Sequence, residues 1–539
     1  MLYYKCIGKE RDKNGKIARY LLVDFCGSRA YITSSELKAL LKTGQASVIN
    51  LTLTSDNRLI DKVCNDNTPI IDQTSSVQKF IAKAKMMGVE ISDYVFSADL
   101  KTLIKYTGKS EKPLIPPVEI IDCNCFEGNQ FIQSVVIPES VRILGQYAFN
   151  RCDNIREFVL QTHELKAYSC SISLAKVENF TIPDGKYKLS HQALLGSSYI
   201  GKLNTINIQN KSIFENNSGY SSFFGVSAKR IVLPEGISEI PDFMFQSISV
   251  EDINIPNTVT SIGNGAFAKA KISKIHFGDN ITHIGCEAFR QATIGDIHLG
   301  NGIKVIYDGT FEKSEIHRIN IPDSVVKIGE DAFNGCEIHG DFSIPDSVKV
   351  VAARAFREID VKGNIEHIPT KMYTIGEFAF YLSKFTGNLD LRNAVSVEKG
   401  AFIGNEFDTV LISNKLNKIG IGGISGCCAE YKFTADNHKF ITNGTMVAEK
   451  LDNGKFAITA YACKCKHNRI KVSDNNIVEI KAFAFAFSPN ITSVEILIPI
   501  KMGTGAFAYC EKLKRVKINK NSTVGANAYA GAFPEINWV

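Results

Sequence analysis

Charged and imidazole side chains recur at a nearly fixed spacing in this chain of 539 residues, and their chemistry suits binding. The first series alternates in sign at every step and consists of Asp252, Lys274, Asp296, Arg318 and Asp341. The second series consists of Asn254, His276, His298, Asn320 and Ser343, with Asp390 further on. On stacked strands, which lie about 4.8 Å apart, equivalent residues form columns. We interpret the first column as a charge ladder, in which each pair contributes ~0.2–1 kcal/mol, and both columns as a candidate recognition surface.

The second column contains two adjacent imidazoles, His276 and His298. Without a third ligand nearby, two imidazoles fall short of a zinc site. Both side chains would become charged at mildly acidic pH, which would change stacking or binding. We therefore predict no metal at this pair.

Cysteines form the other group that resembles metal ligands. The group consists of Cys427, Cys428, Cys463, Cys465 and His467. The spacing C-x-C-x-H is not that of a standard zinc knuckle, so we predict reduced thiols without a metal or cofactor. Whether these five residues gather in space is left open.

No arrangement typical of catalysis occurs along the chain. The sequence lacks G-x-S-x-G, the phosphate loop G-x-x-x-x-G-K-[ST] and H-E-x-x-H. The glycines stand mostly at regular offsets where turns are expected. We therefore predict that the protein is not an enzyme.

Composition indicates which kinds of partner and which cellular compartment are to be expected. The 62 Lys+Arg and 56 Asp+Glu give a net charge of +6, too weak to predict nucleic-acid binding. No apolar run reaches the roughly 18 residues of a membrane span. Charged residues from Lys5 onward stand where a leader needs an apolar run, so we expect a cytoplasmic protein, or a secreted or cell-surface one if a leader has been removed. The 14 cysteines are dispersed, which favours reduced thiols over a disulfide scaffold.

A phenylalanine with a constant period indicates which elements position these columns. The series is Phe245, Phe267, Phe289, Phe311 and Phe333, each 22 residues after the previous one. A period of 20–29 residues is typical of a leucine-rich-repeat solenoid, here mainly β. The motif IPxSVxxIGxxAFxxC is explicit at Ile321–Cys336 and recurs at Ile137–Cys152. Its first Ile predicts a short strand that Pro ends, its Val and second Ile point inward, and its Phe and Cys pack in the core.

The period divides the chain into two predicted domains. Residues 1–110 form a small α+β module, with strands at Leu2–Ile7, Ala18–Phe25 and Ala46–Leu53 and helices at Glu36–Leu41 and Ser75–Met87. Residues 111–539 form the solenoid. The 22-residue period is less regular between residues 160 and 223, where we expect Tyr168 and Leu194 to replace the Phe. Turn signals predict a β-hairpin excursion at 431–469, and residues 520–539 are expected to cap the end, with Trp538 over the last layer.

The repeated motif resembles that of the BspA-like leucine-rich repeat family, also called the Treponema pallidum-type repeat. The excursion resembles a variant unit of that family through Asn437, Phe440, Gly444 and Met446. The resemblance covers residues 115–539 and implies a curved solenoid used for protein binding, often as a bacterial surface adhesin. It implies no catalytic residues.

Three functions follow as hypotheses. The first is a non-enzymatic scaffold that binds a protein partner through its concave β face. The second is a secreted or cell-surface bacterial adhesin that binds a host. The third is an effector in which residues 1–110 carry an activity and the repeats select the target.

Overall fold

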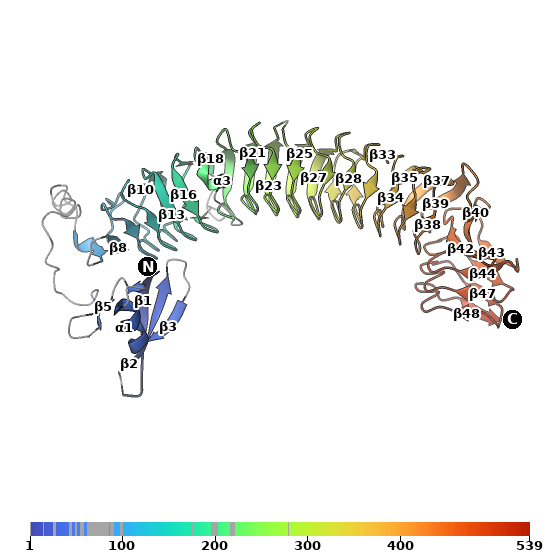
Figure 1. The fold of residues 1–539 in the computed structure, drawn as a ribbon, viewed down its shortest axis with the longest axis horizontal. Helices are drawn as coiled ribbons and strands as arrows, with labels where there is room; N and C mark the ends of the chain where they lie inside the picture. Colours follow the sequence, from blue (N-terminus) through green and yellow to red (C-terminus); the bar gives the residue numbers. More distant parts are fainter. Residues whose placement is uncertain are drawn as a thin grey trace. The chain divides into compact units, whose positions relative to one another are not determined.

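Short parallel strands stacked at the repeat period recur along most of the chain (Figure 1). The structure is a computed structural model that describes residues 2–14, 16–24, 29–42, 46–48, 51–53, 59–61, 86, 91–97, 101–174, 176–195, 203–215, 221–278 and 280–539. The chain divides into two compact units, of which the first comprises residues 1–258 and 270–272 and the second comprises residues 259–269 and 273–539. The predicted mainly β repeat solenoid is confirmed.

The described residues of the N-terminal module form a mixed sheet, the helix α1 and a separate strand pair. Its elements are β1 (Leu2–Arg11), β2 (Ile17–Asp24), β3 (Arg29–Thr33), α1 (Ser34–Lys42), β4 (Ala46–Val48) and the antiparallel pair β5 (Leu51–Leu53) and β6 (Leu59–Asp61). The sheet order is β3-β2-β1-β4, with β4 parallel to β1. The sequence missed β3, and its predicted helix at Ser75–Met87 lies outside the described residues except for Met86.

A capping box begins the helix of the module. The Thr33 backbone N–H donates to Glu36 Oε2 at 2.9 Å, and the Glu36 N–H donates to Thr33 Oγ1 at 3.3 Å. This reciprocal pair satisfies donors that a helix start leaves free. The Thr33 hydroxyl also donates to Glu36 Oε2 at 2.7 Å, and this bond, followed by that from the Thr33 backbone N–H, holds the pKa of Glu36 below its usual value. Thr33 is therefore the N-cap, rather than the serines that follow it.

The array of the first unit begins before residue 111, where the sequence placed its start. The strand β8 (Thr102–Tyr106) already pairs in parallel with β9 (Ile120–Ile121). The sheet order is β16-β13-β11-β9-β8-β7, with β7 (Tyr94–Phe96) following the 3-10 turn at Ile91–Asp93. The other strands here are β10 (Ser134–Ile137), β11 (Ile143–Leu144), β12 (Glu157–Leu160), β13 (Glu164–Ala167), β14 (Ile172–Ser173), β15 (Asn179–Ile182), β16 (Lys186–Leu189), β17 (Leu194–Leu195), β18 (Leu203–Ile208), β19 (Ser227–Val232), β20 (Glu239–Ile240) and β21 (Ser249–Asn254), with the short helix α3 (Ser212–Glu215).

Between residues 160 and 223, where the period is less regular, the core position of the Phe persists, but one of the residues that occupy it differs from the prediction. The Phe149 N–H donates to Ser171 O, and the Ile172 N–H donates to Ala193 O. This pattern of bonds between repeats makes Ile172, not Tyr168, the equivalent of Phe149. Leu194 is the next equivalent, as predicted. The aromatic residue was misleading because Tyr168 lies four residues too early in the repeat.

The second unit repeats one coil many times. Its strands up to the excursion are β22 (Ser261–Ile262), β23 (Lys271–His276, which spans the division between the units), β24 (His283–Ile284), β25 (Thr293–His298), β26 (Val305–Ile306), β27 (Glu315–Asn320), β28 (Lys327–Ile328), β29 (Glu337–Ile338), β30 (Phe342–Ser343), β31 (Val350–Val351), β32 (Asp360–Val361), β33 (Ile365–His367), β34 (Thr374–Ile375), β35 (Thr386–Leu391), β36 (Ser396–Val397), β37 (Glu406–Ile412), β38 (Lys418–Ile419) and β39 (Cys428–Phe433). The remaining strands are β40 (Phe440–Thr442), β41 (Met446–Lys450), β42 (Phe456–Tyr461), β43 (Arg469–Val472), β44 (Ile477–Ile480), β45 (Ser493–Ile496), β46 (Lys501–Met502), β47 (Arg515–Ile518), β48 (Thr523–Val524) and β49 (Glu535–Trp538).

A stack of phenylalanine rings forms the centre of this unit. The ring of Phe311 lies 5.5 Å from that of Phe289 and 5.2 Å from that of Phe333, with interplanar angles of 10° and 19°. The residues two before and two after each Phe have positive φ in almost every coil, as Glu287 (56°) and Gln291 (56°) do around Phe289. Alternating φ signs let the amide of Phe289 donate to the next coil, at Thr310 O.

The Cys position of the motif has a bonding role as well as a packing role. Cys152 Sγ donates to Phe126 O at 3.0 Å, and Cys510 Sγ donates to Phe485 O at 3.1 Å. Ser383 makes the same bond where Cys is replaced, to Phe356 O at 2.6 Å. In these three coils a small donor three residues after the Phe therefore ties the coil to the one before it.

The excursion is an antiparallel meander of β40, β41 and β42, with turns at the two predicted Asn-Gly pairs. The strand β42 then pairs in parallel with β44, which returns the chain to the stack. Glu449 of the meander bonds to Lys481 and lies 3.3 Å from Lys439 Nζ. Burial alone raises the pKa of Glu449, but the bonds and charges of Lys481 and Lys439 outweigh it and hold the pKa below its usual value.

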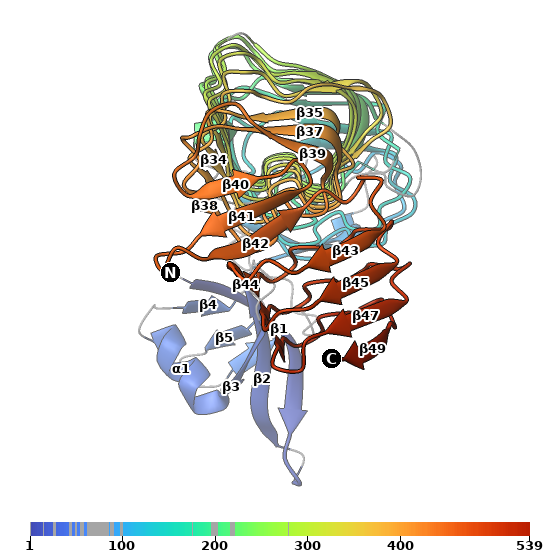
Figure 2. The same cartoon turned by 90° about the vertical axis from the view of Figure 1, so that its right-hand side faces the viewer.

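The last coil does not close the stack. The strand β49 pairs in parallel with β47, with Trp538 opposite Ile518 (Figure 2). Trp538 is 51% exposed and Phe533 is 98% exposed. The predicted cover by Trp538 is therefore wrong, because residues 535–538 form one more strand of the sheet instead of crossing its end.

Candidate functional site

The long strands of the array have a pattern of burial that the sequence did not reveal. In β27, Ile316 and Ile319 are buried, and the two residues between them, His317 and Arg318, are both exposed. A strict alternation would expose only one residue between two buried ones. Each long strand thus presents more polar side chains than the motif indicates.

The structure brings part of the first column together. Asp296 stands opposite Arg318 in the register of β25 and β27, and His298 stands opposite Asn320. In the first unit the ladder has an additional member, Arg230, which lies opposite Asp252 with Nε 3.5 Å from its Oδ2. Lys274 and His276 lie on β23, whose neighbour in the sheet is β25. Asn254 lies on β21, opposite Val232.

The closest partner of Asp296 is not its register neighbour. His317 Nδ1 lies 2.7 Å from Asp296 Oδ1. This hydrogen bond, followed by the charges of His317 and Arg318, holds the pKa of Asp296 below its usual value. Sequence reasoning missed His317 because it took the strands to alternate strictly.

The columns do not extend to Asp341 and Ser343 as predicted. The strand β29 ends at Ile338, and Asp341 Oδ1 accepts the backbone N–H of Asn364 at 2.7 Å. Ser343 belongs to a separate strand, β30. The step from Phe333 to Phe356 is 23 residues, and the extra residue breaks the register. Gly340 also lies so close to Arg318 that an added Cβ would stand 2.8 Å from its Cγ.

A cluster that the sequence did not identify replaces the missing members. Glu315 stands opposite Glu337, and Glu337 stands opposite Asp360. Like charges in register are destabilising, and contacts with His339 and Lys362 offset this repulsion. His339 Nε2 lies 3.1 Å from Glu315 Oε1, and Lys362 Nζ lies 2.6 Å from Asp360 Oδ2.

We call the outward-facing side chains of this region the long-strand surface. It comprises Lys274, His276, Thr293, Asp296, His298, Glu315, His317, Arg318, Asn320, Glu337, His339, Asp360 and Lys362. Acidic, basic and imidazole groups are interspersed over five neighbouring strands, β23, β25, β27, β29 and β32, with an apolar core beneath them. Such a surface offers discrete polar contacts.

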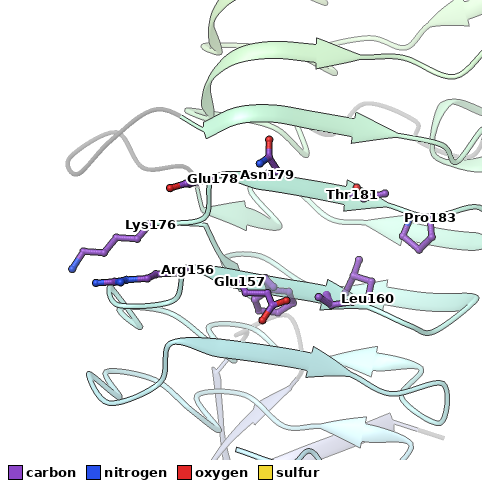
Figure 3. A pocket seen from close by; sticks show the side chains of 10 residues that line it. Arg156, Glu157, Leu160, Lys176, Glu178, Asn179, Thr181 and Pro183 are labelled. Carbon is purple, nitrogen blue, oxygen red and sulfur yellow. The ribbon is translucent and has the colours of Figure 1, made fainter. Parts of the chain in front are cut away.

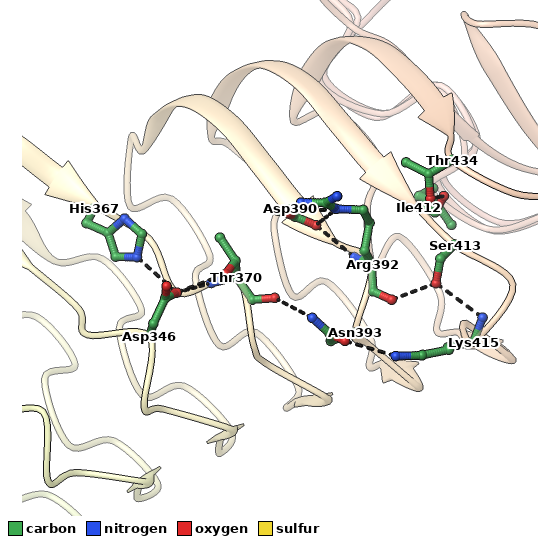
Figure 4. A network of polar contacts seen from close by, with 10 residues as sticks. All are labelled: Asp346, His367, Thr370, Asp390, Arg392, Asn393, Ile412, Ser413, Lys415 and Thr434. Carbon is green, nitrogen blue, oxygen red and sulfur yellow. Dashed lines mark hydrogen bonds and ion pairs between the residues drawn. The ribbon is translucent and has the colours of Figure 1, made fainter.

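A separate seam of hydrogen bonds joins successive coils further along the second unit (Figure 4). Asp346 Oδ1 accepts from the backbone N–H of Thr370 at 2.7 Å and from His367 Nε2 at 3.1 Å. Asp390 pairs with Arg392 at 2.6 Å. Burial raises the pKa of Asp390, but Arg392 outweighs it and lowers the pKa. Asp390 is therefore engaged in this seam and does not extend the second column.

The cysteines of the excursion gather into two groups. Cys427, Cys428 and Cys463 lie near buried Tyr431, whose hydroxyl donates to Ile424 O, and Cys463 Sγ donates to Cys428 O at 3.7 Å. Cys465 Sγ lies 2.7 Å from the hydroxyl of Tyr461. Burial raises the pKa of the Cys463 thiol to about 12.

These thiols therefore lie in a core environment. His467 contributes only its carbonyl oxygen, 3.3 Å from the Tyr461 hydroxyl. Among the residues that the structure describes, no three His, Cys, Asp or Glu side chains are placed to hold a metal ion.

A groove of about 710 Å³ opens in the first unit between β12 and β15 (Figure 3). The two strands are not hydrogen-bonded neighbours, because β12 pairs with β10 and β15 pairs with β18. Pro183 follows β15 and has no N–H, whereas Gln161 at the equivalent place donates to Ile137 O at 2.9 Å. The rim of the groove carries charges of both signs, such as those of Arg156 and Glu157, and these groups do not point to a common centre.

In the described parts of the chain, no helix is both long and apolar enough to span a bilayer.

Comparisons with known proteins agree with the architecture. The family model described as the BspA type leucine rich repeat region, present in six copies, matches residues 119–219, 216–340, 326–446 and 454–536. No curated protein matches the chain.

Comparison with solved structures finds bacterial leucine-rich repeat proteins at low identity and low TM-score. A leucine-rich cell surface protein from Faecalibacterium prausnitzii A2-165 is 17% identical, with 83% of this chain and 92% of that chain covered and a TM-score of 0.30. A leucine-rich repeat protein from Bacteroides ovatus is 16% identical, with coverage of 83% and 97% and a TM-score of 0.32. The leucine-rich repeat protein of T. pallidum is 19% identical, with coverage of 46% and 88% and a TM-score of 0.17. Since the family model matches well over half of its residues, the chain belongs to the BspA-type leucine-rich repeat family.

Proposed function

We propose that this protein is a non-enzymatic scaffold that binds a protein partner through its long-strand surface. The observation that carries the proposal is the row of exposed polar side chains held in fixed register over β25, β27, β29 and β32. Because the underlying Ile and Phe residues are buried, these side chains keep their spacing without a ligand. Preorganised groups lose less conformational freedom on binding, which favours affinity.

The mixture of acidic and basic groups on this surface favours a protein over a simpler ligand. Asp296, Arg318 and Glu315 lie within one pair of strands, so a partner must present both signs at matching positions. A folded protein surface can do this, and like-charge contacts then exclude wrong partners. The long strands, rather than the groove at β12 and β15, are therefore the proposed site.

Charge reversal tests the proposal. Lysate of the native organism is passed over the immobilised chain and over the Lys274→Glu/Arg318→Glu variant. The control Lys304→Glu/Lys327→Glu changes net charge equally at exposed positions outside the long-strand surface. The partner is expected on the native chain and the control but not on the variant. Equal recovery by all three proteins places the site elsewhere and overturns the proposal.

A further inference from the structure

The net positive charge of this chain comes from one segment, residues 464–539. The whole chain has 62 Lys+Arg and 56 Asp+Glu, and residues 464–539 hold 11 and 5 of them. The excess of six in this segment equals the net charge of +6 of the chain, so residues 1–463 are neutral in balance. An asymmetry of this kind marks a surface that attracts acidic partners.

The structure places much of this charge on one sheet of the second unit. The strands β43, β45, β47 and β49 are neighbours in that order, as Figure 2 shows. In β43 and β47 the burial alternates strictly, so Arg469, Lys471, Arg515 and Lys517 all face outward while Val516 and Ile518 face the core. Unlike the long-strand surface, this sheet presents a single regular row of side chains on each strand.

The register arranges these four cations at the corners of a rectangle. Ser493 of β45 lies between Arg469 and Arg515, and Glu495 lies between Lys471 and Lys517. The long edges span two strand spacings, about 9.6 Å, and the short edges span two residues of one strand, about 6.6–6.8 Å. A groove of about 720 Å³ runs over the sheet, and Lys514 adds a fifth cation to its lining.

These cations have no ion-pair partner in the described part of the chain, which includes all of residues 464–539. Other lysines of the unit are paired, as Lys418 Nζ is with Glu398 at 2.7 Å and Lys501 Nζ is with Glu479 at 3.0 Å. Glu495 is one carboxylate among four corner cations, so most of the positive charge remains available to a ligand.

The placement of the carboxylates decides the class of ligand. Glu495 and Glu535 interrupt the cations, so a uniformly charged polyanion such as nucleic acid would meet repulsion along its length. An extended peptide carries its alternate side chains on one face about 6.6–6.8 Å apart, which matches the spacing of Arg515 and Lys517 along β47. Arginine forks also bind carboxylates in a bidentate geometry.

We propose that the exposed side of β43, β45 and β47 is a second binding surface, which takes an extended acidic polypeptide segment with carboxylates on alternate residues. This inference goes beyond the proposed function, because it concerns a different surface and a different chemistry. Salt weakens the interaction, since the contacts are exposed charge pairs.

The test measures the fluorescence anisotropy of a labelled ten-residue peptide of alternating Glu and Ser upon titration with the full chain at low salt. We expect saturable binding that weakens at least ~10-fold in Arg515→Glu/Lys517→Glu. The neutral pair Arg515→Ser/Lys517→Ser should weaken it less. The matched control Lys304→Glu/Lys327→Glu should stay within ~2-fold, since it is equal in charge change but lies elsewhere.

Competitors distinguish the ligand classes. A peptide of the same composition with its five Glu contiguous should bind more weakly, and duplex DNA should not displace the alternating peptide. The proposal is overturned by the absence of binding, by an equal loss in the control variant, or by displacement with DNA at matched charge concentration. None of these outcomes bears on the Lys274→Glu/Arg318→Glu pull-down, so the two proposals fail separately.

Discussion

Replacing Phe311 by Ala removes one ring from the middle of the stack. Phe311 is fully buried and contacts a ring on each side, Phe289 at 5.5 Å and Phe333 at 5.2 Å. Since each coil contacts only its neighbours, the damage should be greatest in the coils that contain these three residues.

The expected loss of stability follows from the ring contacts and the buried apolar volume that the substitution removes. Truncating a buried Phe to Ala costs ~3–5 kcal/mol, of which the two ring pairs account for ~0.5–1.5 kcal/mol each. Phe311→Leu keeps most of the apolar volume and should lose mainly the ring contribution, ~1–3 kcal/mol. Phe533→Ala is the matched control, because Phe533 is 98% exposed, and it should change stability by less than ~0.5 kcal/mol.

Native-state hydrogen exchange is the suitable assay, because a repeat array does not guarantee two-state unfolding. The reporting amides are those of Phe289 and Phe311, which donate to Thr310 O and Ala332 O at 2.8 Å. In Phe311→Ala the opening free energy at Phe289 should fall by ~3–5 kcal/mol. A change no larger than that of Phe533→Ala would refute the stacked-core account.

Three further predictions concern packing, pH and thiols. An added Cβ at Gly295 would stand 1.9 Å from Ser273 O, so Gly295→Ala should destabilise β25 by ~1–3 kcal/mol, measured by urea unfolding beside Thr293→Ala, which changes an exposed residue of the same strand; equal losses would contradict the clash. Because the folded-state pKa of Glu449 is lowered, its bonds stabilise the fold above the ordinary pKa of about 4.3, and this contribution is lost as pH falls through the lower folded value. Glu449→Gln should therefore lower Tm at pH 7 but much less at pH 3, and a pH-independent difference would argue against it. Burial raises the pKa of Cys336 and of Cys510 to about 12, so both thiols should react with iodoacetamide at pH 8 at least ~10³-fold more slowly in the native than in the unfolded protein, as followed by mass spectrometry; comparable native and unfolded rates would contradict their burial.

The sequence was sufficient to predict the residues that form the core. The period of Phe267, Phe289 and Phe311 reflects a ring that must stack in every coil, so its spacing is visible without a structure. The excursion was equally predictable, because Asn-Gly pairs such as Asn443-Gly444 need a positive φ that Gly444 adopts at 92°. Local chemistry determined both features.

Side-chain partners on the surface were much less predictable. His317 bonds to Asp296 because two exposed residues separate the buried isoleucines of β27, a local departure from alternation. Asp341 left the column because one extra residue shortened β29. A shift of one residue is enough to change every contact of a column, and hydrophobic spacing alone does not reveal it.

The basic sheet formed by β43, β45, β47 and β49 was likewise not predicted from the sequence. Net charge over the whole chain is small, so the sequence did not predict an electrostatic site. Only the fold shows that Arg469 and Arg515, 46 residues apart in sequence, flank one strand.

Histidine footprinting with diethylpyrocarbonate tests the central claim most directly. His298, His317 and His339 are exposed on the long-strand surface, and His438 is exposed on the excursion as an internal control. With the partner recovered by pull-down bound to the native chain, modification of the first three should fall at least ~5-fold, while that of His438 stays constant. Unchanged modification of His298, His317 and His339 in the complex would contradict binding through the long-strand surface.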